Sequence, residues 1–301
     1  MTSRAELIAH ARDSIARGSK SFAVASRLFD RATRERAWLL YAWCRAADDL
    51  ADGQEMGHGM HAVSDPHARL ATIRTLSAAA LAGENTGNPA FDALGVVARE
   101  CEIPERYVHD LIDGFALDAD GFLPGDEAAL YRYCYHVAGA VGCMMAIVMG
   151  VDPDDEGVLD RACDLGIAFQ LANIARDVAE DAAAGRCYMP PGWDREMLAA
   201  RAGRHEASAR YGARALRFRA AWAVLAAAGI YGDIARLAAR RGASGRVSTS
   251  GAAKLGWVLR AVVQALFRRW IRDPGCDGLY IRPSRSLSDR KANATELSAT
   301  P

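Results

Sequence analysis

Apolar residues recur every three or four positions along most of this 301-residue chain, while runs of alternating β-branched residues are scarce. Such a period gathers apolar side chains on one face of an α-helix, whereas a half-buried strand needs strict alternation. The sequence therefore predicts an all-α protein. Helices are expected over residues 3–17, 31–52, 67–82, 89–101, 104–118, 127–150, 155–181, 194–200, 205–227, 229–241 and 251–272.

Composition narrows the class of protein further. Hydrophobic residues make up 51% of the chain, and Lys plus Arg equals Asp plus Glu at 37 each, so no global charge favours a nucleic-acid partner. No stretch has the composition of an interdomain linker. We therefore expect a single all-α domain over residues 1–282, followed by a polar, disordered tail over 283–301.

Cysteine usage and the N-terminal residues indicate the compartment. The seven cysteines form no CxxC pair and have no zinc-type spacing, and the first residues lack the apolar run of a signal peptide. These features predict a reduced, cytoplasmic protein. The longest apolar run, 137–151, is shorter than the roughly 20 residues that span a bilayer, so we interpret it as a buried helix.

The segment YAWCRAADDLAD, residues 41–52, combines acids and an arginine on one predicted helix face. At about 100° per residue, four polar side chains fall within an arc of roughly 60°. They are Tyr41, Arg45, Asp48 and Asp52. Leu39 and Trp43 project on the opposite side, so one face is charged while the other is suited to a core.

A second segment, FQLANIARDVAED at residues 169–181, repeats this pattern. Its polar stripe covers an arc of about 80° and borders an apolar face. The stripe consists of Gln170, Asn173, Asp177 and Asp181, with Arg176 nearby. Like charges four residues apart cost an isolated helix roughly 0.2–0.5 kcal/mol, so a partner that compensates them is expected.

Carboxylate and amide oxygens without a clustered His or Cys are suitable ligands for Mg²⁺ or Mn²⁺. Mg²⁺ typically binds one or two carboxylates together with substrate phosphate oxygens. A single DxxxD motif is ordinarily a solvated helix face. Two copies, each with an arginine beside it, make a metal-diphosphate site an equally good interpretation of the pattern.

Several motifs in order resemble the squalene and phytoene synthase family. The segments YAWCRAADDLADG, YRYCYHVAGAVGCMMAIVMG and LGIAFQLANIARDVAEDAAAGRCYMP are similar to its successive signatures. GSKSF near the start and RVSTSGAAKLGWVL near the end also match, so the likeness runs from about residue 14 to 272. Its most similar form is the bacterial branch that serves carotenoid biosynthesis.

This resemblance implies a fold and a reaction. Family members join two prenyl diphosphates head to head, in an isoprenoid-synthase-type helical fold with a central cavity between the two aspartate helices. For this chain it implies condensation of two geranylgeranyl diphosphates through prephytoene diphosphate to phytoene, with release of diphosphate. The product's double-bond geometry and any nucleotide requirement stay open.

The resemblance also assigns roles to individual residues. Metal at one diphosphate would be held by Asp48 and Asp52, and metal at the other by Asn173, Asp177 and Asp181. Further substrate contacts would come from Tyr41, Arg45, Gln170 and Arg176. Arginine favours such phosphate contacts because its planar guanidinium matches phosphate oxygens.

Three other groups of residues carry expectations from the family. Ser19, Lys20 and Ser21 lie in a segment similar to the flap over the diphosphate, although a helix-capping turn would use the same residue types. Val137, Val141 and Met145 recur at helical spacing and would line a tunnel for prenyl tails, with ordinary core packing as the alternative. Gly139 and Gly142 in this helix allow close helix approach.

Tyr133 matches a family position proposed to assist proton removal, a task that departing diphosphate could also perform. Its role is therefore a hypothesis.

Other functions remain as alternatives. Squalene or dehydrosqualene synthesis from farnesyl diphosphate is the nearest, and squalene formation would need NADPH, which we do not expect here. A noncatalytic relative would be expected to lack the aspartate pairs. A di-iron bundle needs two ExxH helices, and the one match, Glu55 to His58, lies in a glycine-rich segment.

The segment KLGWVLRAVVQALFRRWIRD, residues 254–273, is cationic near its end and carries Trp257, Phe267 and Trp270. It could lie at the inner face of a membrane as a peripheral contact, or pack as a C-terminal helix whose arginines favour its own dipole. Nothing in the sequence indicates the oligomeric state.

Overall fold

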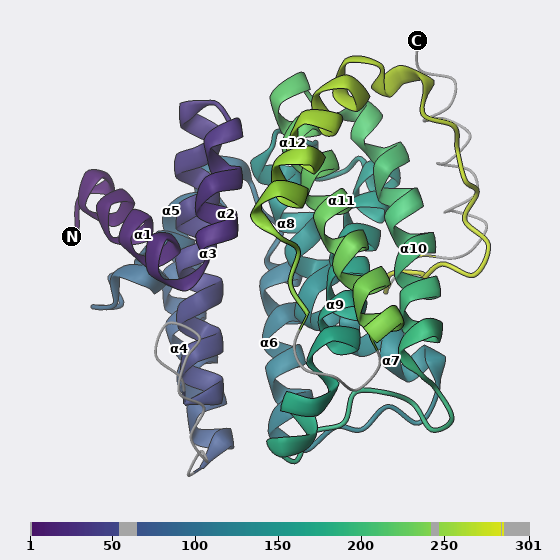
Figure 1. Cartoon of the computed structure of the whole chain (residues 1–301). Coiled ribbons are helices and arrows are strands. Elements are labelled where there is room, and N and C mark those ends of the chain that lie inside the picture. The colour runs from purple at the N-terminus through teal and green to yellow at the C-terminus, as the bar shows by residue number, and fades with distance from the viewer. Residues whose placement is uncertain (1, 54–64, 242–246, 284, 286–301) are drawn as a thin grey trace. The chain divides into compact units, whose positions relative to one another are not determined.

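The computed structural model describes residues 2–53, 65–241, 247–283 and 285, apart from the side chains of Lys20, Ser21 and Arg241. The helices are α1 (Arg4–Gly18), α2 (Lys20–Ala25), α3 (Arg31–Asp52), α4 (Pro66–Leu81), α5 (Pro89–Cys101), α6 (Glu105–Ala119), α7 (Glu127–Cys134), α8 (Ala140–Val148), α9 (Glu156–Ala183), α10 (Arg195–Gly212), α11 (Phe218–Arg241) and α12 (Gly251–Leu266). A π-helical turn, Tyr135–Gly139, joins α7 to α8, and 3₁₀ turns occupy Ser26–Leu28, Ala213–Ala215 and Arg268–Trp270. The described part of the chain contains no strand (Figure 1), which confirms the all-α prediction.

The chain forms two compact units. The first contains Met1–Asp120 and Ile147–Pro153, and the second contains Gly121–Ala146 and Asp154–Pro301. In the first unit, α1 and α5 pack against α3, and α4 packs against α5. In the second, α9, α10 and α11 lie side by side and α12 runs along α11 (Figure 1). The expected single domain over residues 1–282 stays a prediction.

Local sequence signals define both ends of α3, the helix with the first acidic stripe. The Asp30 carboxylate caps its start by accepting a hydrogen bond from the Thr33 backbone N–H at 3.0 Å. Gly53 ends it with a left-handed backbone (φ 64°), a conformation that favours glycine. The Trp43 indole N–H donates to the Ser77 hydroxyl at 3.2 Å, which ties the buried face of α3 to α4. The acidic face of α3 is therefore directed away from this core.

In the second unit, glycines bring the helix after Tyr133 into backbone contact with α9. A Cβ added at Gly142 would collide with the Ala162 carbonyl oxygen, and one added at Gly166 would collide with the Ala138 carbonyl. A Cβ at Gly139 would lie 2.9 Å from the Cys163 sulfur. The expected close approach at Gly139 and Gly142 is therefore confirmed.

Replacing Gly166 by Ala should destabilise the protein by at least about 2 kcal/mol, since the backbone of a packed helix must move to accommodate the methyl group. Gly203→Ala is a matched control, because Gly203 also lies inside a helix but an added Cβ meets nothing within 4 Å. This control should gain up to about 1 kcal/mol from helix propensity. Urea unfolding measures both changes, and equal free energies for the two variants would contradict the packing account.

The predicted helix breaks after residue 200 and before 229 are wrong. Helix α10 runs unbroken through Gly203, and α11 runs unbroken through Gly229. Gly229 serves packing, because the Trp257 indole occupies the space that a Cβ would need. The real break is at the 3₁₀ turn Ala213–Ala215, and the sequence also did not predict α2 or the π turn.

Buried arginines fasten the C-terminal segment to α9. Arg282, 4% exposed, donates from Nε to Asp160 at 2.7 Å and also pairs with Glu156. Arg161, 2% exposed, donates to Asp273 at 3.2 Å. Arg285 lies 3.4 Å from Asp160, so one residue of the predicted tail makes a contact. Residues 284 and 286–301 lie outside the described residues, and their disorder stays a prediction.

One helix in the described part of the chain has the length and composition of a membrane span. This segment, Phe218–Arg240 in α11, has 61% of its apolar window buried inside the protein, as a core helix would. The ExxH match of the di-iron alternative, Glu55 to His58, lies outside the described residues.

Candidate active site

In the first unit, the polar stripe of α3 forms a cluster of half-buried side chains. The Arg45 guanidinium donates from Nη1 to Asp48 Oδ2 at 2.6 Å and lies 3.6 Å from Asp49 Oδ1. Tyr41 and Asp52 are also half-buried, on the same helix. The arginine therefore balances part of the negative charge that the stripe carries.

Burial raises the pKa of Asp48 to about 7; the Arg45 guanidinium offsets part of this effect, and the carboxylates of Asp52, Asp49 and Asp118 add to it. The side chain of Asp48 keeps 39% of its surface accessible, so a cation could still reach it. The positive charge of Arg45 does not fully compensate the Asp48 carboxylate. A divalent cation bound beside it would lower its pKa and favour the ionised form.

Asp49 and Asp118 are members of this cluster that the sequence reasoning missed. Asp49 is adjacent to Asp48 in the chain, but its projection on the helix falls outside the arc that defined the stripe. Asp118 belongs to α6 and influences Asp48 only because the fold brings the two helices together. No sequence spacing could have identified it.

The GSKSF segment lies against the same cluster. A Cβ at Gly18 would lie 2.5 Å from the Tyr41 hydroxyl oxygen, and the Phe22 ring centroid is 5.6 Å from that of Tyr41. Burial raises the pKa of Tyr41, so its phenol stays protonated and available as a donor. The structure thus brings this segment to Tyr41 and Arg45, as the flap expectation requires.

Ser19 separates α1 from α2 and acts as a helix cap. Its hydroxyl oxygen accepts from the Phe22 backbone N–H at 3.3 Å. The capping alternative is therefore correct for the Ser19 oxygen, while its hydroxyl hydrogen can still be donated to a ligand. Lys20 and Ser21 begin α2, and their side chains lie outside the described residues.

In the second unit, the polar stripe of α9 forms another half-buried cluster. Arg176 pairs with Asp177 through two hydrogen bonds, one of them from Nε at 2.7 Å. The Asn173 amide donates to Gln170 Oε1 at 3.4 Å. All four of these polar side chains, and Asp181 one turn further on, are half-buried at the edge of the core.

Two features of α9 fit a divalent cation. The Asn173 Oδ1 atom is buried and accepts no hydrogen bond in the described part of the structure. Burial raises the pKa of Asp181 to about 6, and the neighbouring Asp177 carboxylate adds to the effect. Among the described residues, no three His, Cys, Asp or Glu side chains form a complete ligand set. One or two carboxylates and an amide are nevertheless sufficient when substrate phosphates complete the coordination.

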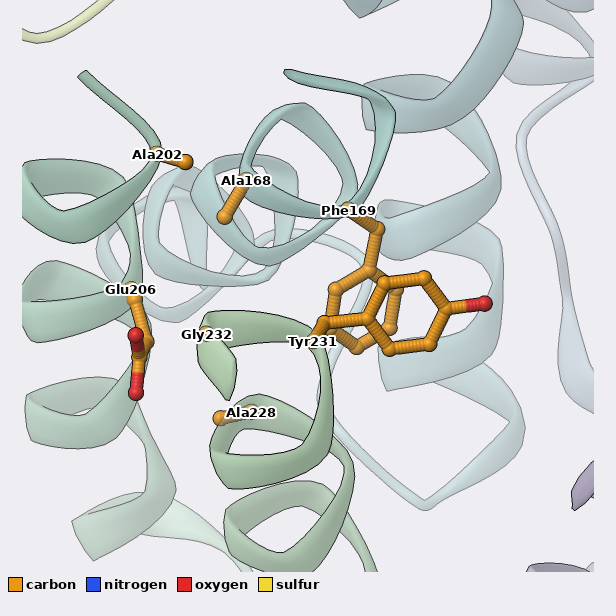
Figure 2. Close-up of a pocket in the computed structure, with 7 residues that line it drawn as sticks. All are labelled: Ala168, Phe169, Ala202, Glu206, Ala228, Tyr231 and Gly232. Carbon is orange, nitrogen blue, oxygen red and sulfur yellow. The ribbon is translucent and has the colours of Figure 1, made fainter. Parts of the chain in front are cut away.

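A stacked aromatic pair supports the α9 cluster from α11. The ring centroids of Phe169 and Tyr231 lie 3.9 Å apart, and Figure 2 shows the two rings overlapping beside a small cavity. This cavity, about 10 Å³, has room for about one water molecule and no prenyl chain. Burial raises the pKa of Tyr231, which also interacts electrostatically with Arg176 and Asp177. Sequence reasoning missed Tyr231, since it belongs to α11 and is distant in sequence from the stripe.

Tyr133 is buried between two other rings. Its ring stacks on Tyr188 at 4.7 Å between centroids and on Phe122 at 5.6 Å. The predicted tunnel residues lie further along the same segment, and all three are half-buried: Val137, Val141 and Met145. This partial exposure is compatible with a lining role, which stays a prediction.

The structure therefore brings the predicted residues together within each unit. Tyr41, Arg45, Asp48 and the Gly18–Phe22 segment meet in the first, and the α9 stripe is intact in the second. The expectation that both stripes border one cavity stays a prediction.

Known proteins similar to this chain give its family. The model of the squalene/phytoene synthase family matches residues 15–196. A 15-cis-phytoene synthase from Paracoccus sp. is 43% identical over 83% of this chain and 89% of the relative. A phytoene synthase from Pseudescherichia vulneris is 41% identical over 93% of this chain and 99% of the relative.

Solved structures show the same fold. A dehydrosqualene synthase in complex with ligand superposes with a TM-score of 0.77 at 24% identity, over 88% of this chain and 98% of that structure. The shared architecture is the helical isoprenoid-synthase fold, as predicted. With a family model matching more than half of the sequence and relatives above 40% identity over most of its length, this chain belongs to the squalene/phytoene synthase family.

Proposed function

We propose that this protein is a phytoene synthase, which condenses two geranylgeranyl diphosphates head to head and releases diphosphate, as a step of carotenoid biosynthesis. The observation that carries the proposal is the identity of about 40% to bacterial phytoene synthases over most of both chains. Both aspartate pairs, which a noncatalytic relative would be expected to lack, are present on half-buried helix faces.

We further propose that Mg²⁺ or Mn²⁺ serves as the cofactor. Asp48 and Asp52 would hold metal at one diphosphate, and Asn173, Asp177 and Asp181 at the other. The donor set consists of hard oxygens, and the buried, unpaired Asn173 Oδ1 is a ready ligand. When bound, the cation neutralises charge on the leaving diphosphate.

The protein's own side chains would orient the substrate and keep the reaction dry. Arg45 and Arg176 each carry further N–H groups beyond those bonded to aspartate, and these can donate to phosphate oxygens. The protonated Tyr41 phenol beside Arg45 can add one donor, and Gln170 orients Asn173. The half-buried stripe of Val137, Val141 and Met145 would contact the prenyl chains and exclude water from the allylic cation.

Metal binding should be strongly pH-dependent. The pKa of Asp48 is raised to about 7 and that of Asp181 to about 6. In the folded protein, both carboxyls therefore stay protonated to a higher pH than they do in the unfolded chain. Without metal, their contribution to stability is therefore lost as pH rises from about 4 to about 7. A cation competes with these protons, so the increase in Tm on adding Mg²⁺ should be larger at about pH 8 than at about pH 5.5.

Differential scanning fluorimetry with and without Mg²⁺ at the two pH values measures this difference. The control is Asp13→Asn, which replaces an exposed carboxylate on α1 and should leave the pH dependence unchanged. A Tm increase that is equal at both pH values would contradict metal binding by these two carboxyls.

A product assay tests the function. Purified protein with Mg²⁺ or Mn²⁺, without NADPH, should convert geranylgeranyl diphosphate alone to a C40 hydrocarbon with phytoene's mass and conjugated-triene absorption. A C30 product from farnesyl diphosphate, with none from the C20 substrate, would instead identify dehydrosqualene synthesis. Absence of product from both substrates would overturn the enzymatic proposal.

A further inference from the structure

Helix α12 is firmly anchored to the second unit by its inner face. Ala261 and Ala265 are fully buried, and the Trp257 indole packs over Gly229 of α11. The Trp222 indole N–H donates to the Val258 carbonyl at 2.8 Å. These contacts fix the rotation of α12 about its own axis. The face opposite to them is therefore directed away from α11.

That outward face is apolar. Six large hydrophobic side chains between residues 255 and 270 are 52–77% exposed: Leu255, Leu259, Val263, Leu266, Phe267 and Trp270. Only two others, Val24 and Leu123, are comparably exposed among the described residues. The four within α12 fall inside an arc of about 80°. This outer face of α12 is therefore a continuous stripe, unlike the scattered exposure that is normal for single residues.

The end of the stripe carries an aromatic pair. Phe267 and Trp270 stack with centroids 5.3 Å apart, and Trp270 is the most exposed of the six at 77%. Tryptophan is enriched where one side of a surface is wet and the other apolar, because its ring is large and its N–H is polar.

The charged side chains of the segment that carries the stripe are all positive. Residues 251–272 contain five basic side chains and no Asp or Glu. Of these, Arg260, Arg269 and Arg272 are exposed. The next acid along the chain, Asp273, pairs with Arg161. Two copies of such a face would repel each other, so an anionic partner suits it better than a second copy of this chain.

We propose that the outer face of α12 docks onto an anionic phospholipid bilayer, lying in its interface with Phe267 and Trp270 inserted. An amphipathic helix with apolar and aromatic residues on one side and arginines beside them binds such surfaces by apolar burial and electrostatic attraction together. The proposal concerns a surface and is independent of the reaction proposed above.

Vesicle flotation of the whole protein tests it without any substrate. Wild-type protein should bind vesicles containing about 30% phosphatidylglycerol at least about tenfold more tightly than phosphatidylcholine vesicles. Added salt at about 0.5 M should remove most of that preference, since it screens the arginines. Wild-type protein that stays unbound with phosphatidylglycerol vesicles would overturn the proposal.

Variants distinguish binding through the outer face of α12 from nonspecific hydrophobic binding to vesicles. Leu259→Gln combined with Leu266→Gln should weaken binding at least about tenfold, because two apolar anchors are lost. Leu123→Gln is the matched control, since Leu123 is 64% exposed against 61% and 60% for the other two. Arg269→Glu with Arg272→Glu should weaken binding only to the anionic vesicles, also roughly tenfold. Thermal unfolding checks that each variant is folded.

Two results would overturn the assignment. Equal binding by the Leu259/Leu266 variant and the Leu123 variant would place membrane contact elsewhere. A dimer in solution that these same substitutions dissociate, without vesicle binding by wild-type protein, would assign the face to a second copy of the chain.

Discussion

Replacing Asp48 by Asn should lower kcat/KM by about 10²–10³ and, at the same time, raise the metal-free Tm at about pH 8. Activity falls because a neutral amide cannot replace a charged metal ligand. Stability rises because burial raises the pKa of Asp48 to about 7, so its ionised form opposes folding at higher pH. Arg45 keeps a partner in the variant, since Asp49 lies 3.6 Å away.

The opposite signs of these two effects are the evidence for a functional role. Steady-state kinetics with geranylgeranyl diphosphate and differential scanning fluorimetry without metal measure them. Asp13→Asn, an exposed carboxylate on another helix, is the control and should change neither. A variant with wild-type activity would exclude Asp48 as a ligand, and a lowered Tm would show that the carboxylate stabilises the fold instead.

Replacing Arg282 by Met should destabilise the protein by about 3 kcal/mol. The guanidinium is 4% exposed and donates to Asp160, itself 2% exposed, and to Glu156. Methionine has a similar length but no donor, so Asp160 would stay buried with Arg285 at 3.4 Å as its remaining cation. Chemical unfolding in urea measures the loss.

A surface pair provides the comparison. Arg74→Met breaks an ion pair with Asp113 whose side chains are 53% and 56% exposed, and it should cost less than about 1 kcal/mol. Adding Asp160→Leu to Arg282→Met should recover at least about 1 kcal/mol, since the buried carboxylate that lost its closest cation is removed. Equal losses for the Arg282 and Arg74 variants would show that the buried pair adds no stability.

The helices were largely predictable because their signals are local. The predicted helices 31–52 and 89–101 match α3 and α5 to the residue, since Asp30 and Asn88 cap their starts and both show strong apolar periodicity. The error in α10 and α11 lies at residues 201–204 and 228, where the prediction placed gaps at and next to glycines although both helices continue. A glycine inside a helix is compatible with continuation when packing requires its small size, as Trp257 does at Gly229.

The acidic stripes were predictable for the same reason. A spacing of four residues fixes the helix face of Asp48 and Asp52, or of Asp177 and Asp181, without knowledge of any other element. The sequence could not reveal what the side chains of other helices add. Asp118 of α6 contributes to the raised pKa of Asp48, and Tyr231 of α11 lies beside Arg176 and Asp177.

The sequence by itself determined the helical class, the two polar stripes and the family, since each depends on residue spacing along one element or on ordered motifs. Only the tertiary structure decided which carboxylates have raised pKa values, which arginines are buried, and which face of α12 is left exposed. Burial and pKa depend on the neighbours that distant segments supply, and a single sequence does not specify those neighbours until the chain has folded.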